Sequence, residues 1–395
     1  MPRTILVVLL FASALLAACQ PQEVVLEVTR VVKNEVNVEV TRVVSETVVQ
    51  EATSVVTREV ERVVEITREP LGTTTRPVNL LFPPRFDSDL IMQRGAPLAE
   101  MLSEATGYQF RVGILDNEQA VIDLMCAAPT DTIGILSPGG YVLAHEQCNV
   151  QAGSIAVGED GLPTTMGMLV ARADSGLETL EDLAGASWAV PEEKSLSSNL
   201  YFQALLEDES VDIGESVPMA GESVAMLAVL NEEVDVASAE FIPPILPYEE
   251  RMWDPETDDP EPWRALGLSP QRSPIGYVLF NGEPEFGGYR LRDARSRVFD
   301  VEPDIYDETL IVALSEPLPN ETIAFGRDFP LALARQVGQE LTNFMAEDAC
   351  GLSLCSPDFY NWHGLSPARD EMYDPIRFVQ ETLDLQGSDL LALEP

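Results

Sequence analysis

The sequence predicts an α/β protein in which mostly parallel sheets are flanked by helices on both faces. From residue 77 onward, short apolar runs typical of strands alternate with longer segments whose apolar residues recur at helical spacing. Strands that alternate with helices in this way form parallel sheets covered by helices. The 395 residues are also enough for two domains, at about 100–200 residues each.

The first part of this pattern begins with an apolar run at Pro77. Gly107 ends the first expected helix, residues 120–125 provide the apolar face of the second, and the turn at 137–140 precedes a third that opens at Tyr141. We expect strands at 77–82, 109–114, 132–136, 151–157 and 165–171, and helices at 96–106, at 118–128 and from residue 141 onward.

The second part of the chain repeats the alternation. One segment between these elements, residues 249–263, is charged and rich in proline, which predicts a surface loop. We expect strands at 187–190, 216–219 and 234–239, and helices at 177–183, 195–206, 223–232, 330–345 and 370–385.

The first nineteen residues have the features of a bacterial lipoprotein signal. Arg3 provides a positive charge, residues 5–16 are apolar, and Leu16-Ala17-Ala18-Cys19 matches a lipobox. The apolar run is too short to span a bilayer core of about 30 Å. We therefore predict a signal peptide at 1–18 and a lipid on the Cys19 thiol, which anchors the mature protein outside the cytoplasm on the cell membrane. The alternative is an ordinary secretory signal with a chance cysteine.

Residues 19–76 are predicted to form the lipidated N-terminus and a stalk. Valine dominates residues 20–76, and Val-Thr-Arg recurs at 28–30, 40–42 and 56–58. Part of the segment has helical spacing and part alternates like a strand. The conformation of the stalk therefore stays open, as does self-association through its valines.

Four cysteines remain after Cys19, an even number in an oxidising compartment. Cys350 and Cys355 are close enough in sequence for a local disulfide, which would leave Cys126 and Cys148 to pair with each other. Four cysteines allow three pairings, and the sequence does not choose among them. A metal site is the alternative, but the chain has only two histidines and no CxxC motif. We therefore predict neither a metal site nor a cofactor.

The charge of the chain limits its partners. The formal net charge is −42, and the only lysines are Lys33 and Lys194. Such a surface repels nucleic-acid backbones and anionic lipids, so we expect no nucleic-acid partner and membrane contact only through the lipid. The chain has no G-x-S-x-G elbow, P-loop or H-E-x-x-H motif, and neither His145 nor His363 has the sequence context of a catalytic triad. We therefore do not expect an enzyme.

Two loops that follow predicted strands and precede predicted helices are candidate binding sites. The first is Ser137-Pro-Gly-Gly-Tyr141, and the second extends from Lys194 to Ser198. A helix N-terminus presents unbonded N–H groups and the positive end of the helix dipole, which suits an anion. If the loops face one cleft from different lobes, they would clamp a small ligand. The alternative is that the serines only cap the helices.

Several segments resemble, in the same order along the chain, those of one family. One of these segments is 132–144, Thr-Ile-Gly-Ile-Leu-Ser-Pro-Gly-Gly-Tyr-Val-Leu-Ala. The other segments are 97–107, 119–125, 172–185, 195–198, 228–235, 314–320 and 363–377. Together they resemble segments of the phosphate-, phosphite- and phosphonate-binding family of ABC-transporter substrate-binding proteins, and the resemblance extends over nearly all of residues 78–385.

The resemblance implies a two-lobed type 2 periplasmic-binding fold, whose ligand lies in a cleft that closes by hinge motion. It implies lobe 1 at 77–164, lobe 2 at 165–315, and a return to lobe 1 with the C-terminal helices at 316–395.

The resemblance also indicates which residues line the pocket. Family members usually have an aromatic residue where this chain has Glu118 and a histidine where it has Glu222, and Glu240 falls where members often carry an acid that holds a ligand amine. Extra carboxylates disfavour a dianion and favour a ligand with a cationic group; the alternative is that Glu118 and Glu222 point to solvent. The candidate ligand-binding residues are Ser137, Tyr141, Ser195, Ser197, Ser198, Glu118, Glu222 and Glu240.

These features predict a lipid-anchored extracytoplasmic protein that captures a small polar ligand, phosphonate-like or oxyanion-like, between two lobes. Its second partner would be the ABC permease in the membrane. The alternative is a ligand sensor or a surface interaction protein that keeps the same fold without a transporter.

Overall fold

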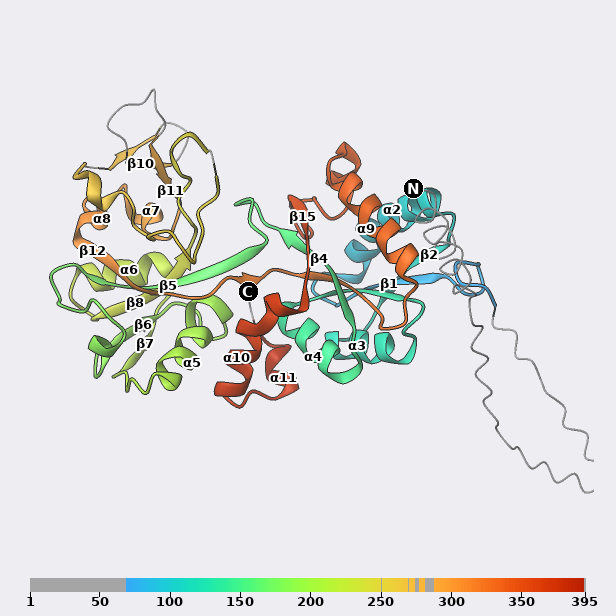
Figure 1. The fold of residues 1–395 in the computed structure, drawn as a ribbon, viewed down its shortest axis with the longest axis horizontal. Coiled ribbons are helices and arrows are strands. Elements are labelled where there is room, and N and C mark those ends of the chain that lie inside the picture. The colour runs from blue at the N-terminus through green and yellow to red at the C-terminus, as the bar shows by residue number, and fades with distance from the viewer. Residues whose placement is uncertain (1–68, 250, 269, 274–276, 281–287, 394–395) are drawn as a thin grey trace, which may run out of the picture. The chain divides into compact units, whose positions relative to one another are not determined.

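The computed structural model describes residues 69–249, 251–268, 270–273, 277–280 and 288–393. The predicted signal peptide, Cys19 and most of the predicted stalk lie outside these residues. No helix in the described ranges is both long and apolar enough to cross a bilayer. The described chain forms two lobes, each built on a six-stranded sheet (Figure 1).

Lobe 1 contains the first sheet and the helices that cover it. The strands are β1 (Val78–Phe82), β2 (Phe110–Ile114), β3 (Thr132–Leu136), β4 (Gln151–Val157), β14 (Thr322–Phe325) and β15 (Gly364–Pro367). Their order in the sheet is β15-β4-β14-β3-β1-β2. The helices are α2 (Ser88–Thr106), α3 (Glu118–Ala127), α4 (Pro138–Cys148), α9 (Leu331–Met345), α10 (Asp374–Thr382) and α11 (Gly387–Leu390).

Lobe 2 contains the second sheet and a small antiparallel sheet. The main strands are β5 (Thr164–Arg172), β6 (Trp188–Val190), β7 (Ser216–Pro218), β8 (Val236–Phe241), β12 (Thr309–Leu314) and β13 (Leu318–Pro319). Their order is β12-β5-β8-β6-β7, with β13 paired to β5. The small sheet contains β9 (Gln271–Arg272), β10 (Val278–Phe280) and β11 (Tyr289–Leu291). The helices are α5 (Tyr201–Asp208), α6 (Glu222–Leu230), α7 (Arg295–Val298) and α8 (Ile305–Glu308).

Both main sheets are mixed, which corrects the prediction of mostly parallel sheets, whereas the two-lobed α/β arrangement is confirmed. In lobe 1, β1 pairs in parallel with β2 and β3, and in lobe 2, β6 pairs in parallel with β7 and β8. The antiparallel neighbours are β14 and β5. Each of these two strands directly follows a connection between the lobes, so no crossover helix restores its direction.

Helix α2 is longer than the sequence indicates. The expected helix starts at residue 96, directly before Pro97, but the structure extends it back to Ser88 and keeps Pro97 inside it. The Asp87 side chain caps the N-terminus by accepting a hydrogen bond from Asp89 N–H. Gly107 ends the helix in the left-handed conformation, with φ of 77°, which glycine adopts without steric cost.

The core of lobe 1 lies on both faces of its sheet. Helices α2 and α9 cover one face (Figure 1), where Leu98, Leu102 and Val337 are almost fully buried. Helices α3, α4 and α10 contribute to the cluster that includes Leu81. This second cluster continues into lobe 2, because the Tyr201 ring of α5 lies 5.8 Å from the Phe378 ring of α10.

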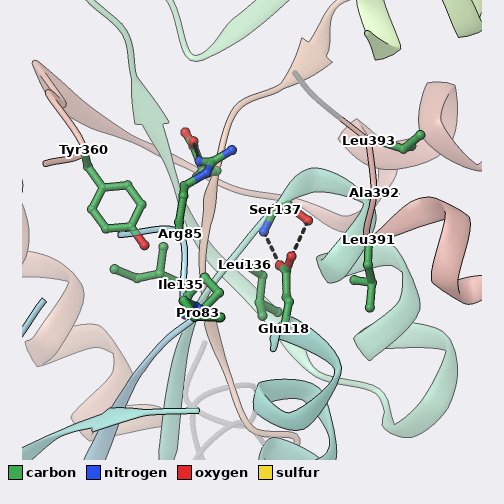
Figure 2. Close-up of a pocket in the computed structure, with 12 residues that line it drawn as sticks. Pro83, Arg85, Glu118, Ile135, Leu136, Ser137, Tyr360, Leu391, Ala392 and Leu393 are labelled. Carbon is green, nitrogen blue, oxygen red and sulfur yellow. Dashed lines mark hydrogen bonds and ion pairs between the residues drawn. The ribbon is translucent and has the colours of Figure 1, made fainter. Parts of the chain in front are cut away.

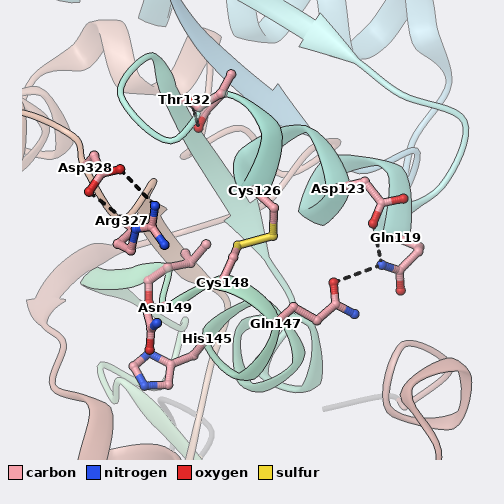
Figure 3. The surroundings of a disulfide bond; sticks show 12 residues. Gln119, Asp123, Cys126, Thr132, His145, Gln147, Cys148, Asn149, Arg327 and Asp328 are labelled. Atoms are coloured by element: carbon pink, nitrogen blue, oxygen red, sulfur yellow. Dashed lines mark hydrogen bonds and ion pairs between the residues drawn. A yellow bond between two sulfur atoms is a disulfide. The ribbon is translucent and has the colours of Figure 1, made fainter. Parts of the chain in front are cut away.

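Two disulfides join the four cysteines, in one of the three pairings that the sequence leaves open. Cys126 near the end of α3 is bonded to Cys148 at the end of α4, with their Cα atoms 5.6 Å apart (Figure 3). Cys350 is bonded to Cys355 in the segment that follows α9. The first bond therefore ties together two helices, whereas the second closes a short local loop.

The segment 249–263, predicted to be a surface loop, is partly buried in its described residues. Trp253 and Trp263 belong to the core of lobe 2 and are 8% and 2% exposed. Glu261 is also buried and pairs with Arg264 and Arg295. The apolar area of the two tryptophans outweighs the charged, proline-rich composition on which the prediction rested.

Candidate functional site

A cavity of about 580 Å³ lies between the lobes, and we call it the interlobe cavity. Lobe 1, the loop between β4 and β5, and lobe 2 all contribute side chains to its lining. The lining contains the charged residues Glu159, Asp160, Glu240, Arg292, Arg297 and Glu321, and the aromatic residues Tyr360 and Trp362. A cavity of this size is in the usual range for a small-molecule site.

A second cavity of about 440 Å³, the α4 cavity, lies in lobe 1 beside the start of α4 (Figure 2). Its lining includes Arg85, Glu118 and Ser137, and it ends against the C-terminal residues 391–393. Glu321 and Tyr360 line both cavities. The two cavities are therefore neighbours that share a wall.

Glu118 is bonded directly to the start of α4. Its carboxylate accepts a hydrogen bond from Ser137 N–H at 2.6 Å and another from the Ser137 hydroxyl at 3.0 Å. The Ser137 oxygen in turn accepts from Gly140 N–H at 2.9 Å and so caps the helix. Glu118 is itself the first residue of α3, capped by Asn117. The positive ends of two helix dipoles thus meet at one carboxylate.

The surroundings of Glu118 affect both its titration and the neighbouring backbone. Burial raises the pKa of Glu118, although its hydrogen bonds from Ser137 act in the opposite direction. A Cβ atom at position 140 would lie 2.2 Å from the Glu118 Oε1. Glycine at this position therefore makes room for the carboxylate.

Most of the other charged side chains around the two cavities form ion pairs. Arg85 pairs with Glu321 on the shared wall. In lobe 2, Arg297 pairs with both Glu222 and Glu240. Glu222 also accepts a hydrogen bond from Glu240 N–H at 2.7 Å, and burial raises the pKa of Glu222.

The predicted site residues are therefore divided among several places. Glu118 and Ser137 line the α4 cavity and Glu240 lines the interlobe cavity, with Glu222 joined to Glu240 through Arg297. Tyr141 lines neither cavity: its hydroxyl donates to Asp370 at 2.9 Å and its ring lies 4.1 Å from the Tyr373 ring.

The loop from Lys194 to Ser198, which we call the serine loop, also lies outside both cavities. Ser195, Ser197 and Ser198 are 6%, 3% and 4% exposed. The Ser195 oxygen accepts from Ser198 N–H at 3.1 Å, at the start of a π-helical turn, Leu196–Leu200, which leads into α5. The Ser195 hydroxyl also lies 3.4 Å from the Ser197 hydroxyl, and the role of the three serines in ligand binding stays a prediction.

Several residues that line the cavities were not among the predicted site residues, namely Arg85, Arg292, Arg297, Glu321, Tyr360 and Trp362. Two signals for them are present in the sequence. Residues 290–297 contain four of the 24 basic residues of this acidic chain, and residues 359–362 contain three aromatic side chains. Within the described residues, no group of three His, Cys, Asp or Glu side chains is arranged to hold a metal ion.

Residues 80–373 match the family model described as "ABC transporter, phosphonate, periplasmic substrate-binding protein". The chain belongs to this family. Membership in the phosphonate-binding family agrees with the two lobes and with the cavity between them. No curated protein sequence matches the chain.

Solved structures with a similar fold include other substrate-binding proteins. A binding protein component of an ABC phosphonate transporter from Pseudomonas aeruginosa is 16% identical, with 78% of this chain and 87% of that chain covered and a TM-score of 0.38. PhnD1 from Prochlorococcus marinus in complex with methylphosphonate is 12% identical, with coverages of 78% and 98% and a TM-score of 0.36. A putative sulfonate-binding protein from Methylobacillus flagellatus is 13% identical, with coverages of 81% and 92% and a TM-score of 0.40.

Proposed function

We propose that this member of the phosphonate-binding family captures a small polar ligand in the interlobe cavity and delivers it to an ABC permease. The observation that carries the proposal is a cavity of about 580 Å³ with charged side chains from both lobes. The two connections between the lobes, at 158–163 and 315–321, would serve as the hinge for closure. Capture requires no covalent chemistry from the protein.

The charges of the lining favour a ligand that carries a cationic group beside an oxyanion or phosphonate group. Glu159, Asp160, Glu240 and Glu321 outnumber Arg292 and Arg297 in the interlobe cavity. Because like charges repel at short range in a partly desolvated site, a bare dianion is disfavoured there. A cationic group on the ligand offsets this repulsion.

We also propose that the protein acts outside the cytoplasm while attached to the membrane through a lipid on Cys19. The sequence around Cys19 supports this assignment, since Leu16-Ala17-Ala18-Cys19 follows a short apolar run. The test is replacement of Cys19 by Ser in cells given labelled palmitate. The wild-type protein is expected to take up label and sediment with membranes, and the variant to lose both properties. A variant that keeps the label would contradict lipidation at Cys19.

A thermal-shift panel on the mature protein in detergent tests ligand capture. The panel contains 2-aminoethylphosphonate, taurine and β-alanine, which share an ammonium group and differ in their acidic group, together with ethylphosphonate and phosphate. At about 100 times the dissociation constant, a ligand adds about 2.7 kcal/mol of stability, which corresponds to a rise of a few degrees in Tm. At least one ammonium compound is expected to exceed ethylphosphonate, and no shift with any compound would contradict the proposal.

A further inference from the structure

Three buried hydrogen-bond donors belong to residues that line the interlobe cavity and have no hydrogen-bond partner among the residues that the structure describes. They are the Arg292 Nε, the Trp362 Nε1 and the Tyr360 hydroxyl. Only six buried side-chain nitrogen or oxygen atoms lack a partner among the described residues, so half of them belong to this one cavity. A buried donor without a partner costs about 1–3 kcal/mol. Three in the lining of one cavity point to a group that the described residues do not supply.

Among the three arginines that line the two cavities, Arg292 alone forms no ion pair within the described residues, although the nearby Asp160 carboxylate favours its charged form. Arg85 and Arg297 form ion pairs. Arg292 instead donates to the backbone carbonyls of Asp160 at 2.8 Å and Pro243 at 3.3 Å. Burial lowers the pKa of Arg292, which is the direction expected of a cation with incomplete compensation. An anion beside the Arg292 Nε would accept a hydrogen bond from it and add negative charge next to the guanidinium.

The two aromatic donors are held rigidly on lobe 1. Trp362 is 2% exposed, and its ring lies 5.0 Å from the Tyr360 ring. Tyr360 also packs against Phe359 at 4.6 Å and Phe86 at 5.2 Å. Figure 2 shows the Tyr360 hydroxyl directed away from its backbone toward Arg85, at the wall that the interlobe cavity shares with the α4 cavity. Burial raises the pKa of Tyr360, so its hydroxyl remains protonated and able to donate at neutral pH.

We propose that Arg292, Trp362 and Tyr360 hold the oxyanion head of the ligand in the interlobe cavity. This inference rests on the proposed function and names the residues that bind the anionic part of the ligand. It locates the head away from the serine loop, where the sequence indicates an anion site. Since Arg292 belongs to lobe 2 and the aromatic donors to lobe 1, a head bound by all three joins the lobes and favours the closed state. Glu159 and Asp160 in the lining are then available for the cationic end.

The test follows the indole N–H resonances of the four tryptophans by NMR in the mature protein labelled with ¹⁵N-tryptophan, during titration with 2-aminoethylphosphonate. Trp188 is the matched control, because its indole N–H is also buried without a partner but Trp188 lines neither cavity. The Trp362 resonance is expected to shift while that of Trp188 stays in place. Arg292→Gln and Tyr360→Phe are expected to weaken binding by about tenfold or more, as expected for the loss of a hydrogen bond to a charged group. Trp188→Phe is expected to leave the affinity unchanged.

Two different results separate failure of this inference from failure of the proposed function. If 2-aminoethylphosphonate or another compound of the panel binds, while the Trp362 resonance stays in place and Arg292→Gln binds like the wild type, the head lies elsewhere and this inference is wrong. If no compound of the panel binds the wild type, the proposed function fails together with the inference. Near-UV circular dichroism of Arg292→Gln and Tyr360→Phe checks that a loss of affinity does not come from unfolding.

Discussion

The Glu118 carboxylate accepts hydrogen bonds from both the backbone N–H and the hydroxyl of Ser137. Ser137 begins α4, where the sequence indicates a site for an external anion. In the folded protein that site already holds an anion of the chain. A ligand oxyanion would have to displace Glu118 to bind there. This competition favours Arg292 over the start of α4 as the binding site of the ligand head.

Glu118→Gln is expected to change the pH dependence of stability. Burial raises the pKa of Glu118 above its ordinary value of 4.5, so the folded state holds this proton more tightly than the unfolded state. The contribution is fully present below the ordinary pKa and is lost as the pH rises through the folded pKa. Urea unfolding of both proteins between pH 4 and 7 is expected to show the variant gaining stability relative to the wild type as the pH rises.

The matched control for that comparison is Glu104→Gln, which removes one charge from an exposed position on α2. The control is expected to show a smaller change across the same pH range. A constant difference in unfolding free energy between Glu118→Gln and the wild type would contradict the assigned environment of Glu118.

Gly140→Ala is expected to destabilise the protein by about 1–3 kcal/mol, the usual cost of overpacking. The added Cβ would lie 2.2 Å from the Glu118 Oε1 and 2.9 Å from the Ser137 Oγ. Combination with Glu118→Ala should recover part of the loss, which a double-mutant cycle of urea unfolding measures. The control is Gly338→Ala in α9, where a Cβ meets nothing within 4 Å; it is expected to be neutral or stabilising by up to about 1 kcal/mol. Strict additivity would exclude the contact with Glu118.

Arg295→Met is expected to destabilise lobe 2 by about 3–5 kcal/mol, because it leaves the buried Asp293 carboxylate without its ion-pair partner and Glu261 with only Arg264. Arg295 is fully buried and pairs with Asp293 at 2.9 Å and with Glu261 at 2.5 Å. Arg327→Met, which breaks an exposed pair with Asp328, serves as the control and should have a much smaller effect. Denaturant unfolding compares the two variants, and similar small losses in both would show that the buried pairs contribute little.

Removal of the two disulfides is expected to have unequal effects. The chain-entropy model gives about 3 kcal/mol for Cys126–Cys148 and about 2 kcal/mol for Cys350–Cys355, because the bonded residues are 22 and 5 positions apart. Double serine variants of each pair, unfolded in urea, measure the difference. A larger loss from the second pair would mean that its local packing outweighs the entropy of the closed loop.

The regular elements of this fold could be predicted from sequence because their signals are local. The expected strand at 132–136 matches β3 residue for residue, and Gly107 ends α2 as expected. The antiparallel direction of β14 and β5 could not be predicted from the sequence, because it depends on how the chain passes between the lobes. The burial of Trp253 and Trp263 was also missed, because the many charges and prolines around them dominate the local composition.

The candidate site could be predicted only in part, for a related reason. Glu118, Ser137 and Glu240 are next to recognisable helix starts or strands, and the structure has them at the two cavities. Arg292 and Trp362 lie in segments without a periodic pattern, 70 positions apart by their numbers in the chain. Their proximity to one cavity is a property of the tertiary fold, so neither segment indicates it alone.

The position of β14 between β3 and β4 has a consequence for how this protein is made. While the chain emerges from the export machinery, β3 and β4 lack the strand that joins them until residues 322–325 have passed. Lobe 1 therefore cannot close its sheet before most of the polypeptide is outside. A nascent chain stopped at residue 320 should remain protease-sensitive in its N-terminal third, and should become resistant only after the later residues arrive.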